Sequence, residues 1–297
     1  RYDEAKTIKN GKIFTLEQDK SNDGKIDVND LEWNYLEGDG DFNSTEIELL
    51  RNEADIIITN PPFSLFRDFL AWIVPSEKKF LIIGSMNAIT YKEVFPLIKN
   101  NEMWLGNGFQ AGNAYFSTPF AKEYALGVYN PETGLVKFRN ICWFTNLDHG
   151  RRHQPLPLMS VEDNLKFSKH KEIKGRDTYE CYDNYDAIEV PFTDAIPNNY
   201  KGVMGVPISF LDKYSPEQFK IVGLTSGREE FECTPSKKYK NPKQHNPDGK
   251  LSNGSKANTR ATLKLASIPS GIYYTADNAD GPLSIVYARI LIQHIKR

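Results

Sequence analysis

The stretch ADIIITNPPFSLF, residues 54–66, limits what this chain can fold into more than any other. Its three consecutive isoleucines predict a strand, and a continuous β-branched run is typical of a strand covered on both faces in a parallel sheet. Two prolines follow. Because proline has no backbone N–H and a fixed φ, neither a ladder-bonded strand nor a regular helix can continue through them. The strand must therefore end at Asn60.

The segments around this strand predict an α/β fold. Ser44 is placed to cap a helix over 45–53. After Ser64 the apolar spacing predicts a helix that ends near Pro75 and has one face made of Leu65, Phe66, Phe69, Leu70 and Ile73. The patterns that follow predict a buried strand at 79–85, a helix at 90–100, and strands at 102–107 and 140–147. This order favours a doubly wound α/β sheet with a hairpin at one edge.

Asn60 lies where a parallel α/β sheet binds ligands, at the carboxyl end of a strand. Its amide oxygen can accept one hydrogen of an amino group, and the carbonyl of Pro61 can accept the other. Holding both hydrogens of an aromatic amine, such as N6 of adenine, favours a tetrahedral nitrogen whose lone pair points at an electrophile. Pro61 and Pro62 make the loop rigid, and Phe63 offers a face on which a purine can stack. A base taken from a duplex would have to be flipped out.

The electrophile that suits such an amine is the methyl sulfonium of S-adenosylmethionine, for which the protein supplies mainly orientation. This chemistry needs no metal. The three cysteines, Cys142, Cys181 and Cys233, are too far apart to indicate a disulfide framework or a C-x-x-C metal site.

Longer strings in the chain resemble one known family. TNPPFSLFRDFL, FLIIGSMNAITYKEVFPLIKN, CWFTNLD, YDNYDAIEV and YKGVMGVPISFLDKYSPEQF are similar to the EcoRI-type adenine-specific DNA methyltransferases, from about residue 38 to about residue 224. The resemblance implies a Rossmann-like catalytic sheet, methyl transfer to adenine N6 in double-stranded DNA, and catalytic roles for Asn60, Pro61, Pro62 and Phe63. It also implies a bacterial restriction-modification or phage-defence setting, with a cognate endonuclease as a partner.

The resemblance also implies that GDGDF, residues 38–42, holds the cofactor's purine. In such enzymes a carboxylate accepts from the adenosyl amino group and a neighbouring aromatic ring packs on the purine, which maps onto Asp41 and Phe42. Asp39 is a competing acceptor. The glycine loop and the ribose-binding strand of the family are not visible before Gly38, so we expect the chain to lack the first strands of the domain.

The second half of the chain has a different composition. We interpret residues 1–148 as the catalytic domain and 149–297 as an irregular target-recognition region. Arg151 and Arg152 follow the last predicted strand, and Lys237 and Lys238 lie in a lysine-rich run, so these four are candidate phosphate contacts, although solvated surface is an equally good reading. Residues 234–260 are polar, rich in Pro, Gly and Asn, and predict a long loop or a mobile insert.

The segment DKSNDGKIDVND, residues 19–30, has carboxylates at the spacing of an EF-hand calcium loop. The last position is Asp30 instead of glutamate, and the preceding residues make a poor entering helix. A calcium site and an Asx-rich hairpin turn both remain open.

Charge and hydropathy limit the class of protein. Residues 1–60 hold 15 Asp/Glu and 7 Lys/Arg, whereas the other 237 residues hold 24 and 30, so a weak basic excess lies where a polyanion could bind. The absence of a long apolar run predicts a soluble, cytoplasmic protein, which we expect to be monomeric. Two other functions remain: an amino methyltransferase acting on RNA or protein, and a DNA-binding module without catalysis.

Overall fold

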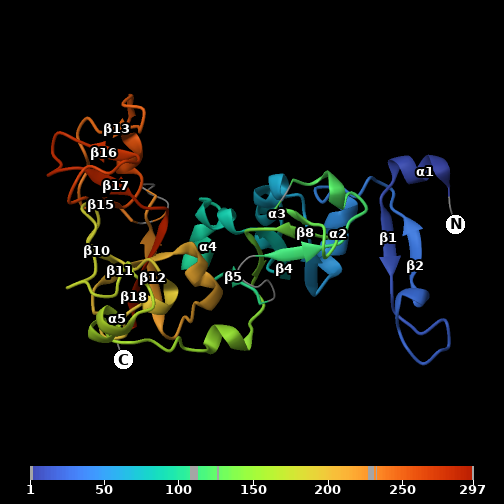
Figure 1. Cartoon of the computed structure of the whole chain (residues 1–297). Helices are drawn as coiled ribbons and strands as arrows, with labels where there is room; N and C mark the ends of the chain where they lie inside the picture. Colours follow the sequence, from blue (N-terminus) through green and yellow to red (C-terminus); the bar gives the residue numbers. More distant parts are fainter. Residues whose placement is uncertain (1–2, 108–112, 126, 227–230, 232, 296–297) are drawn as a thin grey trace. The chain divides into compact units, whose positions relative to one another are not determined.

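The computed structural model describes residues 3–107, 113–125, 127–226, 231 and 233–295, and it divides into two compact units, 1–80 and 81–297 (Figure 1). Each unit is described by itself. The described residues contain both α-helices and short strands, and the strands form several sheets, so the mixed α/β character is confirmed. The doubly wound arrangement stays a prediction. The division into functional regions at residue 148 stays a prediction. None of the described helices has the length and apolar character needed to cross a bilayer.

The first unit places one strand between two helices, after an N-terminal hairpin. Its elements are α1 (Glu4–Lys9), β1 (Lys12–Thr15), β2 (Glu32–Tyr35), α2 (Thr45–Glu53), β3 (Ile56–Thr59) and α3 (Phe66–Ile73). β1 and β2 pair antiparallel. The predicted cap of α2 is confirmed, because the Ser44 side chain accepts a hydrogen bond of 3.3 Å from the Ile47 backbone N–H.

The apolar face of α3 forms as predicted, except at its start. Phe66, Phe69, Leu70 and Ile73 are buried, whereas Leu65 precedes the helix and is 40% exposed. The prediction that β3 is covered on both faces is wrong for the described structure: Ile56 is 49% exposed and Ile58 66%. Side chains alternate across a strand, so these two share one face, and no described residue covers it.

The second unit begins with the strands predicted from the sequence. β4 (Lys79–Ser85), β9 (Ile141–Thr145) and β5 (Trp104–Leu105) lie in that order, and both pairings are antiparallel. β5 and β9 are antiparallel neighbours, as expected for the two edge strands, but they do not form a hairpin because residues 106–140 lie between them in the chain. The Rossmann-like arrangement remains a prediction. The helix expected over 90–100 is shorter, α4 (Phe95–Lys99), because Pro96 is tolerated only in a first helical turn.

Further sheets complete this unit. A three-stranded sheet has the order β6 (Ala114–Phe116), β8 (Leu135–Phe138), β7 (Tyr129–Asn130), and a four-stranded sheet has the order β10 (Ala187–Glu189), β11 (Val203–Pro207), β18 (Arg289–His294), β12 (Phe219–Leu224). α5 (Val161–Phe167) lies between β9 and β10 in the chain. In the four-stranded sheet only β10 and β11 pair in parallel.

The segment 234–260, predicted as a loop or mobile insert, is folded. It supplies two strands of a five-stranded sheet with the order β14 (Leu251–Asn253), β13 (Lys243–His245), β16 (Tyr273–Thr275), β17 (Leu283–Ile285), β15 (Thr262–Lys264). Tyr239 and Ala257 from the segment pack with Tyr274 and Leu283 in a buried cluster. The prediction failed because this core is assembled from residues distant in sequence. We call residues 234–288 the C-terminal lobe; Figure 1 draws it in orange to red.

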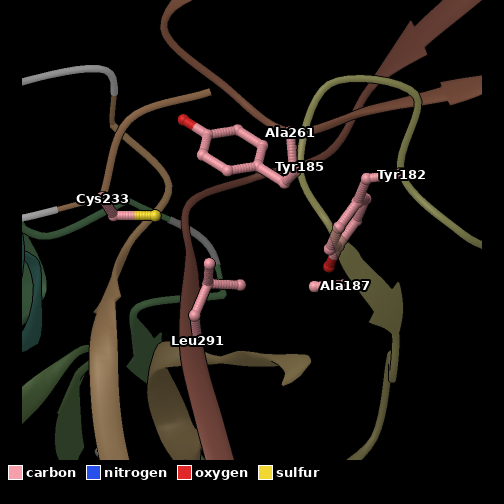
Figure 2. Packing of buried hydrophobic residues seen from close by; sticks show 6 residues of the cluster. All are labelled: Tyr182, Tyr185, Ala187, Cys233, Ala261 and Leu291. Atoms are coloured by element: carbon pink, nitrogen blue, oxygen red, sulfur yellow. The ribbon is translucent and has the colours of Figure 1, made fainter. Parts of the chain in front are cut away.

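A second buried cluster joins the C-terminal lobe to the four-stranded sheet. It consists of Tyr182, Tyr185, Ala187, Cys233, Ala261 and Leu291, which Figure 2 shows converging from separate segments. Beside it, Asn184 is fully buried. Its Nδ2 donates to the carbonyls of Ala257 (3.2 Å) and Arg260 (2.8 Å), and its Oδ1 accepts from the N–H (2.9 Å) and hydroxyl (3.1 Å) of Thr262. One amide side chain therefore satisfies four polar groups of the lobe.

Replacing Asn184 tests this attachment. Asn184→Ala leaves those four groups buried without the amide, so we expect a loss of about 2–4 kcal/mol in the free energy of unfolding. Faster hydrogen exchange at the amides of β15 should accompany it. Asn130→Ala is the matched control, since Asn130 is exposed and, among the described residues, its side chain bonds only to the nearby Glu132 N–H. Equal stability of the two variants would show that Asn184 does not hold the lobe.

Candidate functional site

The Asn60–Phe63 loop leaves β3 as an exposed turn anchored by one proline. Asn60 is exposed and Pro61 is buried. Pro62 has φ −52° and ψ 133°, and its carbonyl accepts from the Leu65 N–H at 2.9 Å, which starts a short 3₁₀ turn (Phe63–Leu65) leading into α3. The prolines thus end the strand, as the sequence predicted, and α3 begins at Phe66, directly after the 3₁₀ turn.

The polar groups of this loop are available to a ligand. Among the described residues, neither the Asn60 amide nor the Pro61 carbonyl has a hydrogen-bond partner. Phe63 is 45% exposed although it is aromatic. Two hydrogen-bond acceptors and an exposed ring face are what the predicted binding of a planar amine requires.

The loop from Gly38 to Phe42 is held by a carboxylate that the sequence reasoning did not single out. Glu46 of α2 accepts from the backbone N–H groups of Glu37 (2.9 Å) and Gly38 (3.0 Å). Gly40 has φ +87°, a conformation that favours glycine. Glu46 and Gly40 together turn the chain back after β2.

The two competing acids on this loop have different local bonds. Asp39 Oδ1 accepts from the Asp41 N–H at 3.0 Å. Asp41 Oδ1 accepts from the backbone N–H (2.9 Å) and side-chain amide (3.2 Å) of Asn43. Both side chains are exposed and each keeps its other oxygen unbonded by any described residue. Asp41 is the more firmly oriented of the two.

The cofactor candidates and the proline loop border the same hollow of the first unit, with a volume of about 880 Å³. It is lined by Asp39, Gly40, Asp41, Phe42, Asn43, Pro62, Leu65, Asp68, Ala71 and Trp72. Asp39, Asp41 and Phe42 were predicted as one group and Pro62 as part of another, so the fold brings together two sets that lie 20 residues apart.

The aromatic wall of this hollow is a packed cluster. The Phe42 ring lies edge-on to Phe69 (centroids 5.4 Å apart) and to Trp72 (5.7 Å). Arg51 places its guanidinium 4.7 Å from the Trp72 ring centre and donates to the Trp72 carbonyl at 2.8 Å. Phe42 is thereby held with its ring half-buried.

Sequence reasoning missed Asp68 and Trp72 in the wall. Both lie on α3, and their spacing of four residues could have revealed them as neighbours on a second face beside the buried one. Asp68 adds a third carboxylate to the hollow, which makes the site attractive to a cation.

The residues present fit S-adenosylmethionine. Carboxylates can accept from its amino and hydroxyl groups and offset its positive charge, and the Phe42 and Trp72 rings can contact its purine. The volume lies within the range of about 300–1,000 Å³ usual for small-molecule sites.

The candidate calcium loop is organised by hydrogen bonds to two carboxylates. Asp19 accepts from the Gly24 N–H at 2.8 Å, and the buried Asp30 accepts from the N–H groups of Lys20, Ser21 and Asp27. These bonds, the one from Asp27 most of all, lower the pKa of Asp30. No described group of three or more His, Cys, Asp or Glu is placed to hold a metal ion. The contacts are those of the Asx-rich hairpin turn.

The candidate phosphate contacts are already engaged within the second unit. Arg151 pairs with Asp212 at 2.7 Å. Arg152 is only 6% exposed; its guanidinium stacks 3.7 Å from the Trp104 ring centre and donates to Asn101. A buried guanidinium has no access to phosphate here.

Lys237 and Lys238 differ in exposure. Lys237 pairs with Asp183 at 2.9 Å and is half-buried, whereas Lys238 is exposed and has no ion pair with a described residue. The DNA-binding role of all four residues stays a prediction, and these positions favour Lys238.

A charged cluster surrounds His153. Its Nδ1 contacts Glu217 at 2.6 Å and its Nε2 contacts Asp148 at 2.8 Å. The Glu217 contact and then the Asp148 contact raise the pKa of His153, and the same bonds lower the pKa of both carboxyl groups. The two carboxylates favour the imidazolium form of His153. Through His153, the segment that follows β9 is linked to Glu217, which lies just before β12.

Comparisons with known proteins identify the family to which the chain is similar. The family described as adenine-specific methyltransferase EcoRI matches residues 2–294. The chain is 42% identical over 232 residues to the Type II methyltransferase M.EcoRI of Escherichia coli, covering 77% of this chain and 68% of that protein. It is also 37% identical to M.MgeORF184P of Mycoplasma genitalium and 32% identical to M.MpnI of Mycoplasma pneumoniae, both Type II methyltransferases, and spans 60% and 57% of their lengths. No solved structure matches the chain significantly.

Proposed function

The chain belongs to the EcoRI family of adenine-specific DNA methyltransferases, and on that premise we propose that its Asn60–Phe63 loop holds the N6 amino group of a flipped-out adenine beside a cofactor hollow. The hollow bordered by Asp39, Asp41, Phe42 and Pro62 takes S-adenosylmethionine. One observation carries the proposal: Pro62 of the acceptor loop lines the same hollow of the first unit as the candidate cofactor residues, which puts Asn60, Pro61 and Phe63 next to a lining residue in the chain.

The loop acts on the amine by fixing its hydrogens. The Asn60 amide oxygen accepts one N6 hydrogen and the Pro61 carbonyl accepts the other, which turns the nitrogen lone pair away from the purine ring. Neither acceptor has a partner among the described residues, so binding the amine breaks no hydrogen bond within that part of the chain. S-adenosylmethionine, when bound, supplies an electrophilic methyl group with a good leaving group.

The remaining residues orient the two partners. Phe63 stacks on the adenine, at about 1–3 kcal/mol by the scale for single-stranded bases. Phe42 packs on the cofactor purine, and Asp41 accepts from its amino group. Asp68 supports the positive charge of the cofactor. Holding the adenine and the cofactor in the reactive orientation can account for about 7–11 kcal/mol of the activation free energy. Positioning is therefore the main contribution of these residues.

The wider setting follows from the family. We place sequence recognition in residues 149–297 and the reaction in a bacterial restriction-modification system, in the cytoplasm, with a cognate endonuclease cutting the same site. The catalytic sheet is Rossmann-like, as in its family. The relatives named Type II methyltransferases support this setting.

Replacing Asn60 tests the acceptor loop. Asn60→Ala should reduce methyl transfer to duplex DNA by about 100-fold or more, the effect of removing one preorganised hydrogen-bonding group from an active site. Asn60→Asp keeps an acceptor oxygen and should retain more activity. The assay is transfer of labelled methyl from S-adenosylmethionine, with cofactor and DNA affinity measured in parallel.

Asn34→Ala is the control for this experiment, because Asn34 is exposed on β2 in the same unit. Turnover of Asn60→Ala close to that of the control would contradict the proposed role of the amide.

Replacing the loop acids tests the cofactor site. Asp41→Asn should weaken S-adenosylmethionine binding by about 10-fold or more, since a hydrogen bond to a charged group contributes about 1.5–3 kcal/mol. Asp39→Asn should have a smaller effect, because the Asp39 side chain is less firmly oriented. Calorimetric titration of the purified chain measures both.

The matched control is Asp55→Asn, an exposed acid between α2 and β3. The reverse order of effects would assign the purine contact to Asp39, and equal affinity of all three variants would remove the hollow as the cofactor site.

A further inference from the structure

The C-terminal lobe carries a basic excess that its own ion pairs do not absorb. Its 55 residues contain eight Lys/Arg and three Asp, a net charge of +5. Lys237 and Lys264 pair with Asp183, and Lys250 pairs with Asp248. The exposed lysines without an ion pair to any described residue are Lys238, Lys240, Lys243 and Lys256. Positive charge is thus left over on a small folded lobe.

The backbone that carries Lys238 and Lys240 is fixed by hydrogen bonds. Asn278 accepts from the Lys240 N–H at 2.8 Å and donates to the Lys238 carbonyl at 3.0 Å. Tyr239, between them, is buried and donates its hydroxyl to Asp183 at 2.7 Å. Lys238 and Lys240 are therefore held on either side of a core residue, immediately before β13.

One face of the sheet is buried and the other is open. Tyr274 belongs to the buried cluster and donates its hydroxyl to Gln244 at 2.7 Å, which sets the inner face. Alternation along each strand then places Lys243 and His245 of β13 on the outer face. The register sets them opposite Asn253 and Leu251 of β14 on one side and Thr275 and Tyr273 of β16 on the other.

The outer face is polar and ordered. The His245 and Tyr273 rings stack with centroids 4.3 Å apart and an interplanar angle of 11°, and His245 Nε2 lies 2.9 Å from the Thr275 hydroxyl. Lys243, Leu251 and Asn253 are exposed. β13 and β14 form a two-stranded ribbon at the edge of the sheet, with Lys243 at one end and the 246–250 turn at the other.

We propose that the outer face of the β14–β13–β16 sheet, together with Lys238 and Lys240, is a surface that binds duplex DNA. The three lysines Lys238, Lys240 and Lys243 contact phosphates, and the β13–β14 ribbon faces a major groove. The charge of the lobe is complementary to a polyanion, and a two-stranded ribbon has the width that the major groove of B-DNA admits. This inference rests on the proposed function, because it takes duplex DNA to be the substrate.

The surface agrees in part with the sequence prediction. Arg151, Arg152 and Lys237 are engaged in internal pairs, whereas the three lysines of this face have no ion-pair partner among the described residues. Lys238, Lys240 and Lys243 all come from the lysine-rich run singled out in the sequence, and the two arginines fall outside the surface.

The test is a triple substitution, Lys238→Gln, Lys240→Gln and Lys243→Gln, in the full chain. If each lysine contacts one phosphate, the slope of log K against log salt falls by about 3, and affinity drops about 10- to 100-fold at low salt. Fluorescence anisotropy with a labelled duplex at several salt concentrations gives both quantities. Circular dichroism checks that the exposed substitutions leave the fold intact.

The control triple is Lys166→Gln, Lys171→Gln and Lys174→Gln, exposed lysines of the same unit outside the lobe, which changes the net charge by the same amount. Loss of affinity and slope in the first triple alone supports the proposal. Equal effects in both triples, or none in the first while the unaltered chain binds DNA, overturn the surface and leave the proposed function standing. An unaltered chain that binds no duplex DNA overturns the proposed function as well.

Discussion

The site depends on the missing backbone N–H groups at Pro61 and Pro62. A strand followed by ordinary residues would pair its carbonyls along a ladder or turn them into a helix. Two prolines stop β3 at Thr59, bury Pro61 and leave the Asn60 amide and the Pro61 carbonyl without partners among the described residues. The loop is therefore polar, rigid and open at one time, which is what holding an amine requires.

Helix α3 connects this loop to the cofactor hollow. Its inner face, made of Phe66, Phe69, Leu70 and Ile73, is buried and fixes the axis of the helix. A neighbouring face supplies Asp68 and Trp72 to the hollow. Phe42 is held against the same helix through Phe69 and Trp72. The acceptor loop and the cofactor wall are thus positioned by one amphipathic element, and a change in its packing would move both.

Local sequence patterns predicted what local physics determines. The cap at Ser44, the apolar face of α3 and the end of β3 depend on neighbours within a few residues, and these predictions were correct except at Leu65, which precedes the helix. The exposure of Ile58 could not be predicted, because the sequence pattern does not show whether a distant segment covers that face of the strand. The folding of residues 234–260 depends on contacts far along the chain. The lobe has strands of three residues, and its order comes from Asn184 and Asp183, some 50–80 residues away from their partners. No window of sequence contains that information.

The central claim is methyl transfer to N6 of adenine, and identifying the modified nucleoside tests it most directly. Duplex DNA treated with the chain and labelled S-adenosylmethionine is digested to nucleosides, which are separated and weighed by mass spectrometry. The account predicts that the label elutes as N6-methyldeoxyadenosine and that it disappears in Asn60→Ala. Label on cytosine, or on RNA or protein but not on DNA, would contradict it.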